Sequence, residues 1–353
     1  MSSSSLARPR RLVLAALLPA CLALTACGTA TSSGRGGPPG ADGTGDLPVV
    51  RFALDWTPNT NHTGLYVALE EGYFAEVGVD VEVLPYTDTP PDQLVDAGVA
   101  ELGISAHDAS VMAQTAGADV VAVLAPLQHW ATAIGVRADD DSISRPRDLD
   151  GTTYAGFGAP YEDPVLRQVI RADGGTGDFT TVTLGSAAYD AVYTGRADFT
   201  IPFVAWEGIE AERAGHPLRY FRYTDYGFPD AYAVVVDADR RWAAQHPDLA
   251  AAVVGALRRG YELARDEPDA AARILVAANP GMFSDPDLVT ASQRALAADL
   301  MTAPDGGVGS IDPDRWAGYA DFLLDNGLLT DPAGDVVTER PDWSAFFTNE
   351  YLR

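Results

Sequence analysis

The sequence predicts an α/β protein that is built as two lobes. Short β-branched runs alternate with helical patterns from Val49 to Leu127, and a second alternating set runs from Thr152 to Gly215. Strand and helix that alternate along a chain are typical of an α/β sheet. Roughly 300 residues follow the N-terminal region. This is more than a single hydrophobic core usually accommodates, so two lobes are favoured.

Residues 1–26 have the pattern of a bacterial lipoprotein signal peptide. Three arginines precede the apolar run Leu12–Leu24, which is too short to span a bilayer, and Leu-Thr-Ala-Cys follows. This ending resembles a lipobox, so we expect lipidation at Cys27 and a flexible linker over residues 27–47. The alternative is an ordinary cleaved signal with an incidental cysteine. Lipid chains would hold the protein at the membrane surface.

The composition excludes several kinds of chemistry. The two cysteines, Cys21 and Cys27, both precede the globular part, which therefore has no thiol for a disulfide, a metal or catalysis. All 24 basic residues are arginine, which excludes a lysine Schiff base. With 50 acidic residues and a net charge of -26, the surface repels nucleic acid. We predict no cofactor, no metal and a monomer.

The expected elements assign residues 48–137 and 231–353 to the first lobe and 138–230 to the second. Two apolar strands, 131–138 and 231–238, are expected to join the lobes as a hinge. After residue 240 the pattern is almost wholly helical, and these helices are expected to pack on the first lobe. The other predicted strands are 49–54, 79–86, 101–106, 120–127, 152–158, 179–185 and 197–203; the predicted helices are 64–75, 91–97, 107–117, 161–173, 187–195, 204–215, 247–265, 285–301 and 312–327.

Candidate ligand-binding residues follow the strands, because ligands of open α/β sheets bind beyond the carboxyl ends of the strands. After the first strand come Asp55, Trp56, Asn59 and His62. Trp56 is either a stacking plate for a ligand or a core aromatic residue. The Asn59 side chain either faces a ligand or caps the next helix. His62 either bonds a ligand or ties this loop to its neighbour.

Two further strands of the first lobe end in polar residues. Ser105 and Asp108 stand at a helix start and are of the types that cap helices, which favours a structural role over ligand binding. Gln128 and His129 follow the next strand and are better placed for the rim of a cleft.

In the second lobe, a Gly-rich turn that begins at Gly156 opens a helix and carries Phe157, Tyr161 and Glu162. Such a turn can cradle an anion, but the acidic residues stand where the anion would sit. The turn therefore disfavours phosphate, sulfonate or nitrate as the ligand.

Another segment of the second lobe combines a tryptophan with carboxylate side chains. Trp206 and Glu210 are one helical turn apart, with Glu207 beside Trp206. A carboxylate accepts two N–H bonds and tryptophan stacks on a flat ring, so the combination suits an aminopyrimidine. Tyr226 precedes the returning hinge strand and is either a cleft aromatic or part of a plain turn.

Together these stretches resemble the thiamine-pyrimidine-precursor (NMT1/THI5-like) binding proteins of the type II periplasmic-binding-protein superfamily. The resemblance lies in Leu54–Ala68, Glu71–Phe74, Gly156–Gly158 with Glu162, and Trp206–Glu210. It implies a two-lobed protein that closes on its ligand and docks on an ABC permease, with Trp56, Glu162, Trp206 and Glu207 in the site. Hydroxymethyl- or formylaminomethyl-aminopyrimidine is the implied ligand, and the location is the extracytoplasmic membrane face.

The sequence leaves several alternatives open. Relatives that share the Gly-Tyr-Phe element bind riboflavin, sulfonates or nitrate. The resemblance extends to fungal enzymes that make the thiamine pyrimidine, but those use a lysine and a cysteine-rich segment, which this globular part lacks. An exported hydrolase is a further alternative, although neither Gly-x-Ser-x-Gly nor His-Glu-x-x-His occurs. A receptor domain is another. The sequence therefore predicts a binding protein and not an enzyme.

Overall fold

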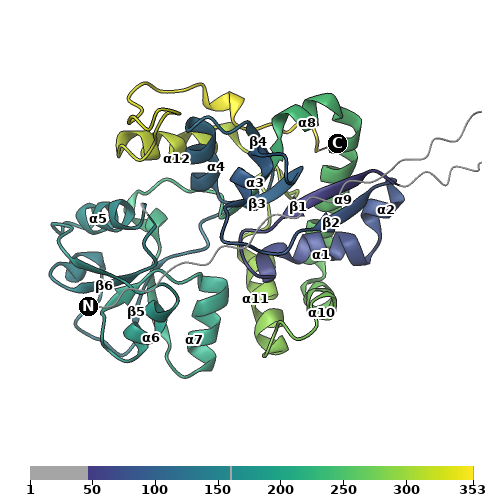
Figure 1. The fold of residues 1–353 in the computed structure, drawn as a ribbon. Coiled ribbons are helices and arrows are strands. Elements are labelled where there is room, and N and C mark those ends of the chain that lie inside the picture. The colour runs from purple at the N-terminus through teal and green to yellow at the C-terminus, as the bar shows by residue number, and fades with distance from the viewer. Residues whose placement is uncertain (1–46, 160, 353) are drawn as a thin grey trace, which may run out of the picture. The chain divides into compact units, whose positions relative to one another are not determined.

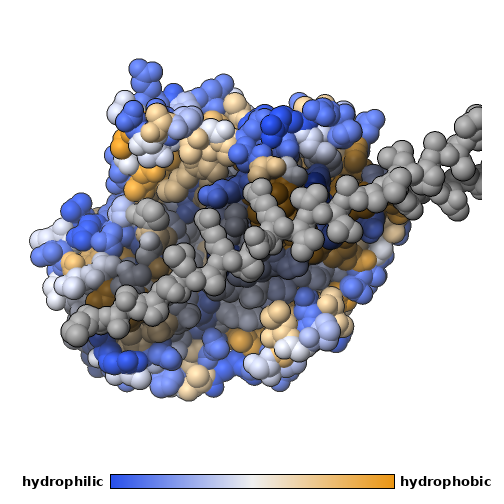
Figure 2. Space-filling model, in the orientation of Figure 1, coloured by the Kyte–Doolittle hydropathy of each residue, from blue (hydrophilic) through white to orange (hydrophobic). Residues whose placement is uncertain are grey.

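The computed structural model describes residues 47–159 and 161–352, and Asp46–Arg353 form one compact unit. The predicted signal peptide and nearly all of the predicted linker, Cys27 included, lie outside the described residues. No helix among the described residues is both long enough and apolar enough to cross a membrane. On the face seen in Figure 2, hydrophilic residues dominate the outer margin, in keeping with the acidic composition.

Two five-stranded mixed sheets define two lobes (Figure 1). The first sheet has the order β2-β1-β3-β10-β4 and the second has the order β7-β6-β8-β5-β9. In the first sheet, β1 runs parallel to β2 and β3, and β10 is antiparallel to β3 and β4. The strands of the first sheet are β1 (Val49–Ala53), β2 (Asp80–Val83), β3 (Leu102–Ser105), β4 (Val120–Leu127) and β10 (Val234–Asp239); those of the second are β5 (Ile134–Arg137), β6 (Thr153–Gly156), β7 (Thr180–Thr183), β8 (Phe199–Thr200) and β9 (Leu218–Phe221).

The helices follow the alternation that the sequence predicts. In the first lobe they are α1 (Thr63–Glu70), α2 (Tyr73–Glu76), α3 (Pro91–Asp96), α4 (His107–Thr115), α8 (Arg240–Gln245), α9 (Pro247–Asp266), α10 (Pro268–Ala278), α11 (Pro286–Asp299) and α12 (Pro313–Asp325). The second lobe contains α5 (Glu162–Ala172), α6 (Ala187–Tyr193), the π-helix η3 (Val204–Gly208) and α7 (Ile209–Arg213). Short 3-10 helices are η1 (Thr60–His62), η2 (Pro146–Leu149), η4 (Tyr223–Tyr226) and η5 (Trp343–Ala345).

Differences from the expected elements have local causes. The helix expected over residues 64–75 is split into α1 and α2, because Gly72 adopts a φ of 75°, which ends one helix and begins the next. The helix expected over 204–215 begins as a π-helix. The strand β9 was not predicted.

The chain crosses between the sheets twice, as expected, but the strands predicted for the crossings each belong to one sheet. β5 pairs with β8 and β9, and β10 pairs with β3 and β4. Residues 134–137, which we expected in the first lobe, therefore lie in the second sheet. The crossings are residues 128–133 and 222–233, and they are tied together where Trp130 N donates to Asp230 Oδ1 over 3.2 Å.

The C-terminal region closes the first lobe. All eight residues of β4 are buried although this strand lies at the edge of its sheet, because bridges from Ala122 to Phe347 and from Ala125 to Gly309 cover that edge. The helices after residue 240 pack on the first lobe as expected, with α9 and α10 against α1 and α12 against α4. In addition, α11 lies against η3 and α7 of the second lobe.

Two glycines allow α1 and α9 to cross in close contact. A Cβ atom on Gly260 would lie 2.0 Å from the carbonyl oxygen of Gly64, and a Cβ atom on Gly64 would lie 2.2 Å from the ring of Tyr261. Only glycine fits at either position without separating the helices.

Candidate functional site

The loop after β1 is held by its own polar side chains. His62 is fully buried, and its Nδ1 accepts a hydrogen bond from the backbone N–H of Asn59 over 3.3 Å. Its ring proton is therefore on Nε2, which donates to Asp55 Oδ1 over 2.7 Å. The Asn59 side chain accepts from Asn61 N over 2.9 Å and caps η1. Of the two sequence alternatives for Asn59 and His62, the structure has the structural one, whereas the Asp55 side chain stays 34% exposed.

The same loop is fixed to the C-terminal helices. Thr60 Oγ1 and Ser292 Oγ in α11 are 2.7 Å apart, and the Tyr261 hydroxyl donates to Asn61 O over 2.8 Å. We call residues 55–62 the site loop. Its position is thus held by hydrogen bonds to two helices that lie more than 190 positions later in the chain.

Trp56 is the exposed member of an aromatic pair in the first lobe. Its side chain is 57% exposed, and its ring centroid lies 5.5 Å from that of Tyr86. Trp56 follows β1 and Tyr86 follows β2, which are parallel neighbours. Trp56 is therefore a surface residue at the carboxyl edge of the sheet and not a core residue. Tyr86 was missed, although it ends the predicted strand 79–86.

An equivalent aromatic pair stands in the second lobe. The Phe157 side chain is 39% exposed, and its ring centroid lies 5.4 Å from that of Tyr189. Phe157 follows β6, and Tyr189 lies in α6, which follows β7. Because β6 and β7 are parallel neighbours like β1 and β2, the two lobes present aromatic pairs from corresponding positions.

Glu162 fills the Gly-rich turn with its own carboxylate. Its Oε1 accepts from Ala159 N over 2.9 Å, and its Oε2 accepts from Phe157 N over 3.1 Å and Gly158 N over 3.2 Å. The Tyr154 hydroxyl adds a fourth bond of 2.9 Å to Oε2. The amides that would otherwise hold an anion are occupied, and the buried Glu162 carboxylate is committed to the turn.

Glu207 is the carboxylate that accompanies the second aromatic pair. Burial raises the pKa of Glu207 to about 7, and the neighbouring Glu210 adds to this rise, although bonds from Phe203 N and the Tyr189 hydroxyl oppose it. Burial and the charge of Glu207 in turn raise the pKa of Tyr189. At neutral pH this carboxyl group is therefore present in both protonation states.

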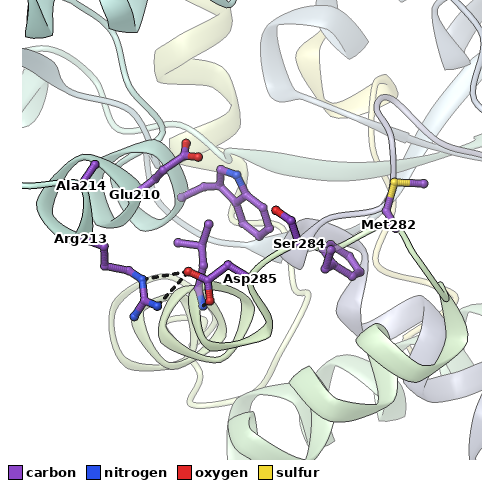
Figure 3. A pocket seen from close by; sticks show the side chains of 9 residues that line it. Glu210, Arg213, Ala214, Met282, Ser284 and Asp285 are labelled. Atoms are coloured by element: carbon purple, nitrogen blue, oxygen red, sulfur yellow. Dashed lines mark hydrogen bonds and ion pairs between the residues drawn. The ribbon is translucent and has the colours of Figure 1, made fainter.

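A pocket of about 360 Å³ lies between the lobes beside these residues (Figure 3). The second lobe contributes Trp206, Glu210 and Arg213, and the first lobe contributes residues 282–285 and Leu288. Trp206 also packs against a hydrophobic cluster of the first lobe formed by Tyr66, Ala272, Leu275 and Val289. Trp206 therefore contacts both lobes.

Three other candidates make their contacts within the fold. The buried Gln128 donates to Ala125 O over 2.7 Å and to Ser310 O over 2.9 Å. Tyr226 lies half-buried in η4 and packs on the core that includes Tyr223 and Phe228. Ser105 is buried and donates to Asp92 Oδ2 over 3.0 Å. The structure does not bring these three side chains together with the aromatic pairs.

Ser105 leads to a buried pair of carboxyl groups, which sequence reasoning missed. Asp92 Oδ1 and Asp237 Oδ2 are buried without a hydrogen-bond partner among the described residues, the two carboxyl groups interact with each other, and Ser110 donates to Asp237 Oδ1 over 2.9 Å. Burial raises the pKa of both, and Asp92 raises that of Asp237 further, whereas the interaction with Asp237 lowers that of Asp92. A proton on one of the two relieves the repulsion between the buried carboxylates and lets them bond to each other.

Asp108 was expected as a helix cap, but the N-cap residue of α4 is Ala106. The half-buried Asp108 carboxyl has a pKa raised to about 6, chiefly by burial. His129 bonds Asp230 Oδ2 over 2.6 Å at the crossing segments. Among the described residues no group of three His, Cys, Asp or Glu side chains is arranged to hold a metal ion.

The proteins similar to this chain include both binding proteins and enzymes. The model of the family described as NMT1/THI5 like matches residues 59–271. The formylaminopyrimidine-binding protein of Halalkalibacterium halodurans is 30% identical, over 90% of this chain and 94% of that protein. A 4-amino-5-hydroxymethyl-2-methylpyrimidine phosphate synthase of Legionella pneumophila is 22% identical, over 65% of this chain and 74% of that protein.

Solved structures share the fold. The periplasmic aliphatic sulphonate binding protein SsuA of Escherichia coli has a TM-score of 0.65 at 17% identity, covering 87% of this chain and 99% of that chain. The ligand-binding component of an ABC-type import system from Staphylococcus aureus has a TM-score of 0.65 at 15% identity, covering 86% and 98%.

Proposed function

The chain belongs to the NMT1/THI5-like family and has the two-lobed type II periplasmic-binding-protein fold, and from this we propose that it captures an aminopyrimidine for an ABC importer. The ligand is of the hydroxymethyl- or formylaminomethyl-aminopyrimidine kind. The Halalkalibacterium halodurans relative, which is named for binding a formylaminopyrimidine, supports this ligand class.

The observation that carries the proposal is the ligand-facing surface of the second lobe. It combines the Phe157–Tyr189 pair with the Glu207 carboxyl, while Glu162 occupies the anion cradle. Aromatic side chains stack on a flat ring, and a carboxyl group pairs with its N–H groups. Such a surface suits a flat ring that bears an amino group, and it disfavours a sulfonate or nitrate.

A binding role is favoured over pyrimidine synthesis although several relatives are synthases. The sequence contains no lysine, so it has no side-chain amine for a Schiff base, and neither cysteine lies in the described residues. These features support recognition without chemistry as the role of the cleft.

The residues that we assign to ligand contact come from both lobes. Asp55 and Trp56 are the proposed contacts from the first lobe. Phe157, Tyr161 and Glu207 are those from the second. Trp206 and Glu210 contribute through the inter-lobe pocket. Asn59, His62 and Glu162 support these side chains through the hydrogen bonds described above.

We also infer that the protein is exported and held at the outer face of the cell membrane by lipid on Cys27, next to its permease. The motif Leu24–Cys27 and the preceding apolar run support this. In cells, mass spectrometry and membrane fractionation should show an acylated protein that becomes unlipidated after Cys27→Ala. Recovery of unmodified, soluble protein with an intact Cys27 would contradict the lipid attachment.

Calorimetric titration of the mature protein tests the ligand assignment. The panel comprises hydroxymethyl- and formylaminomethyl-aminopyrimidine, riboflavin, taurine and nitrate. We expect binding of the aminopyrimidines alone, weakened at least about tenfold by Glu207→Gln or Phe157→Ala. Glu212→Gln, which changes an exposed carboxylate of α7, is the matched control and should bind normally. Binding of taurine or nitrate instead of the aminopyrimidines would overturn the assignment.

A further inference from the structure

The π-helix η3 of the second lobe places two consecutive side chains against the first lobe. Ala205 is 5% exposed and belongs to the hydrophobic core of the first lobe, whose other buried members lie in that lobe or, at Ala131, in the first crossing. Trp206 packs on the cluster of α1, α10 and α11 described above, and its ring centroid lies 6.3 Å from that of Phe283. Separating the lobes would expose this indole and the cluster beneath it to water, which is unfavourable.

η3 is also fixed to its own lobe. Gly208 N donates to Phe203 O over 3.2 Å, which is the i→i−5 bond of a π-helix. A Cβ atom on Gly208 would lie 2.5 Å from the hydroxyl oxygen of Tyr220 in β9, so η3 rests on the second sheet with no room for a side chain there. η3 is therefore carried by the second lobe, and Trp206 is the part of it that reaches across to the first. Single π-helical turns are frequent at functional sites.

The carboxyl group that we assign to the ligand belongs to the same short helix. Glu207 follows Trp206, and its Oε2 accepts from Phe203 N over 3.1 Å, within the turn that forms η3. Its carboxyl group is thus held to the backbone of η3. Where the Trp206 indole docks on the first lobe therefore sets the position of the Glu207 carboxyl relative to that lobe.

Trp206 differs from the aromatic side chains that face the cleft. Trp56 and Phe157 are 57% and 39% exposed at strand ends, where a flat ring can reach them. Trp206 is half-buried, and its apolar contacts are with the first lobe. This arrangement favours a role for Trp206 in holding the lobes together over a role in stacking on the ligand.

We propose that Trp206 is a positioning residue, whose indole docks on the first lobe as the lobes close and thereby sets the Glu207 carboxyl against the ligand. This inference rests on the proposed function. The aromatic pairs contact the ring, and Trp206 stabilises the closed arrangement that holds the ring in place.

The test measures affinity and closure separately in the mature protein. Calorimetry gives the affinity for 4-amino-5-hydroxymethyl-2-methylpyrimidine, and small-angle X-ray scattering at saturating ligand gives the radius of gyration, which falls as the lobes close. Trp206→Ala should bind about tenfold more weakly and should stay more open than the unaltered protein when saturated. Because the contact is apolar, the loss of affinity should be the same at low and high salt. Trp206→Phe keeps an aromatic ring on the cluster and should restore most of the affinity and the closure.

Trp242→Ala is the matched control, because it removes a half-buried tryptophan that packs on the core of the first lobe from α8. It should leave affinity and closure unchanged. Phe283→Ala removes the ring beside Trp206 from the first lobe and gives the same comparison if Trp206→Ala does not fold. Full closure of Trp206→Ala, whatever its affinity, overturns the role of Trp206 alone, whereas no binding of the aminopyrimidine by the unaltered protein overturns the proposed function as well.

Discussion

Arg213 and Asp285 form an ion pair that joins the two lobes. Arg213 Nη2 in α7 donates to Asp285 Oδ2 over 2.8 Å, and Nε donates to the same oxygen over 3.2 Å (Figure 3). Asp285 is also the N-cap residue of α11. Close by, the ring centroids of Trp206 and Phe283 are 6.3 Å apart. These contacts belong to an arrangement in which the lobes touch beside the pocket.

Removing this ion pair should make the closed arrangement less stable. In Arg213→Ala, we expect ligand to dissociate about two- to fivefold faster, with most of the difference lost at high ionic strength, because both side chains are partly exposed. Stopped-flow fluorescence at low and high salt measures this. Arg294→Ala breaks the exposed pair with Asp269, which lies within the first lobe, and should leave dissociation unchanged. Equal rates in both variants would show that the Arg213 pair plays no part in closure.

The Asp92–Asp237 pair should make stability depend on pH. The pKa of Asp237 is raised in the folded state, so the folded protein holds a proton that the unfolded chain releases above about pH 4. The free energy of unfolding should therefore fall as pH rises above this value, until the folded pair releases its proton. Asp237→Asn can keep the bonds to Ser110 and Asp92 without this proton, so its stability should be higher than that of the unaltered protein at pH 8.

Urea unfolding at several values between pH 4 and pH 8 measures both curves. Asp248→Asn, which changes an exposed acid of α9, is the control and should follow the unaltered protein. Parallel curves for Asp237→Asn and the unaltered protein would mean that the pair holds no extra proton.

The Glu162 carboxylate should stabilise the second lobe through its four donors. Glu162→Gln places an amide N–H₂ group against N–H donors, so we expect a loss of about 2–3 kcal/mol. Tyr154→Phe removes one donor and leaves the three amide bonds, so its loss should be nearer 1 kcal/mol. Thermal unfolding of the two variants compares them, and a larger loss in Tyr154→Phe would contradict the dominant role of the amides.

The crossing of α1 and α9 should tolerate no side chain at Gly260. In Gly260→Ala the new methyl group would overlap the Gly64 carbonyl oxygen, which should cost roughly 3 kcal/mol of unfolding free energy. Gly318→Ala in the exposed face of α12 meets no atom within 4 Å and should instead stabilise by about 0.5–1 kcal/mol. Urea denaturation should show these opposite signs, and a stabilised Gly260→Ala would show that the helices can separate freely.

Most of the fold could be predicted from the sequence because the strands are locally distinct. The run 120–127 is apolar throughout and forms β4, and β10 (234–239) ends one residue beyond the predicted span 231–238. Sheet membership was less predictable, since 131–138 is apolar whichever sheet it joins. Its assignment to the second sheet depends on pairing with β8 and with β9, a strand that carries no strong periodicity.

The site was predictable in its segments and less so in its side chains. Trp56 and Phe157 are exposed at strand ends as the pattern suggests. The sequence also places acidic residues at the anion position of the Gly-rich turn, but it does not show that Glu162 accepts four hydrogen bonds there. The surroundings of Asp108 and of the Asp92–Asp237 pair could not be predicted, because they come from segments far away in the chain. Burial by distant segments is not encoded in the neighbouring residues.

The bonds that hold the site loop 55–62 affect the thermodynamics of binding. His62, Thr60 and Tyr261 fix this loop without a ligand, so little conformational entropy remains to be lost when a ring meets Trp56. The entropic cost of capture then falls on the movement of the lobes and on the second lobe. If Trp56 contacts the ligand as we propose, the first lobe provides a half of the binding site that is already formed before the ligand binds.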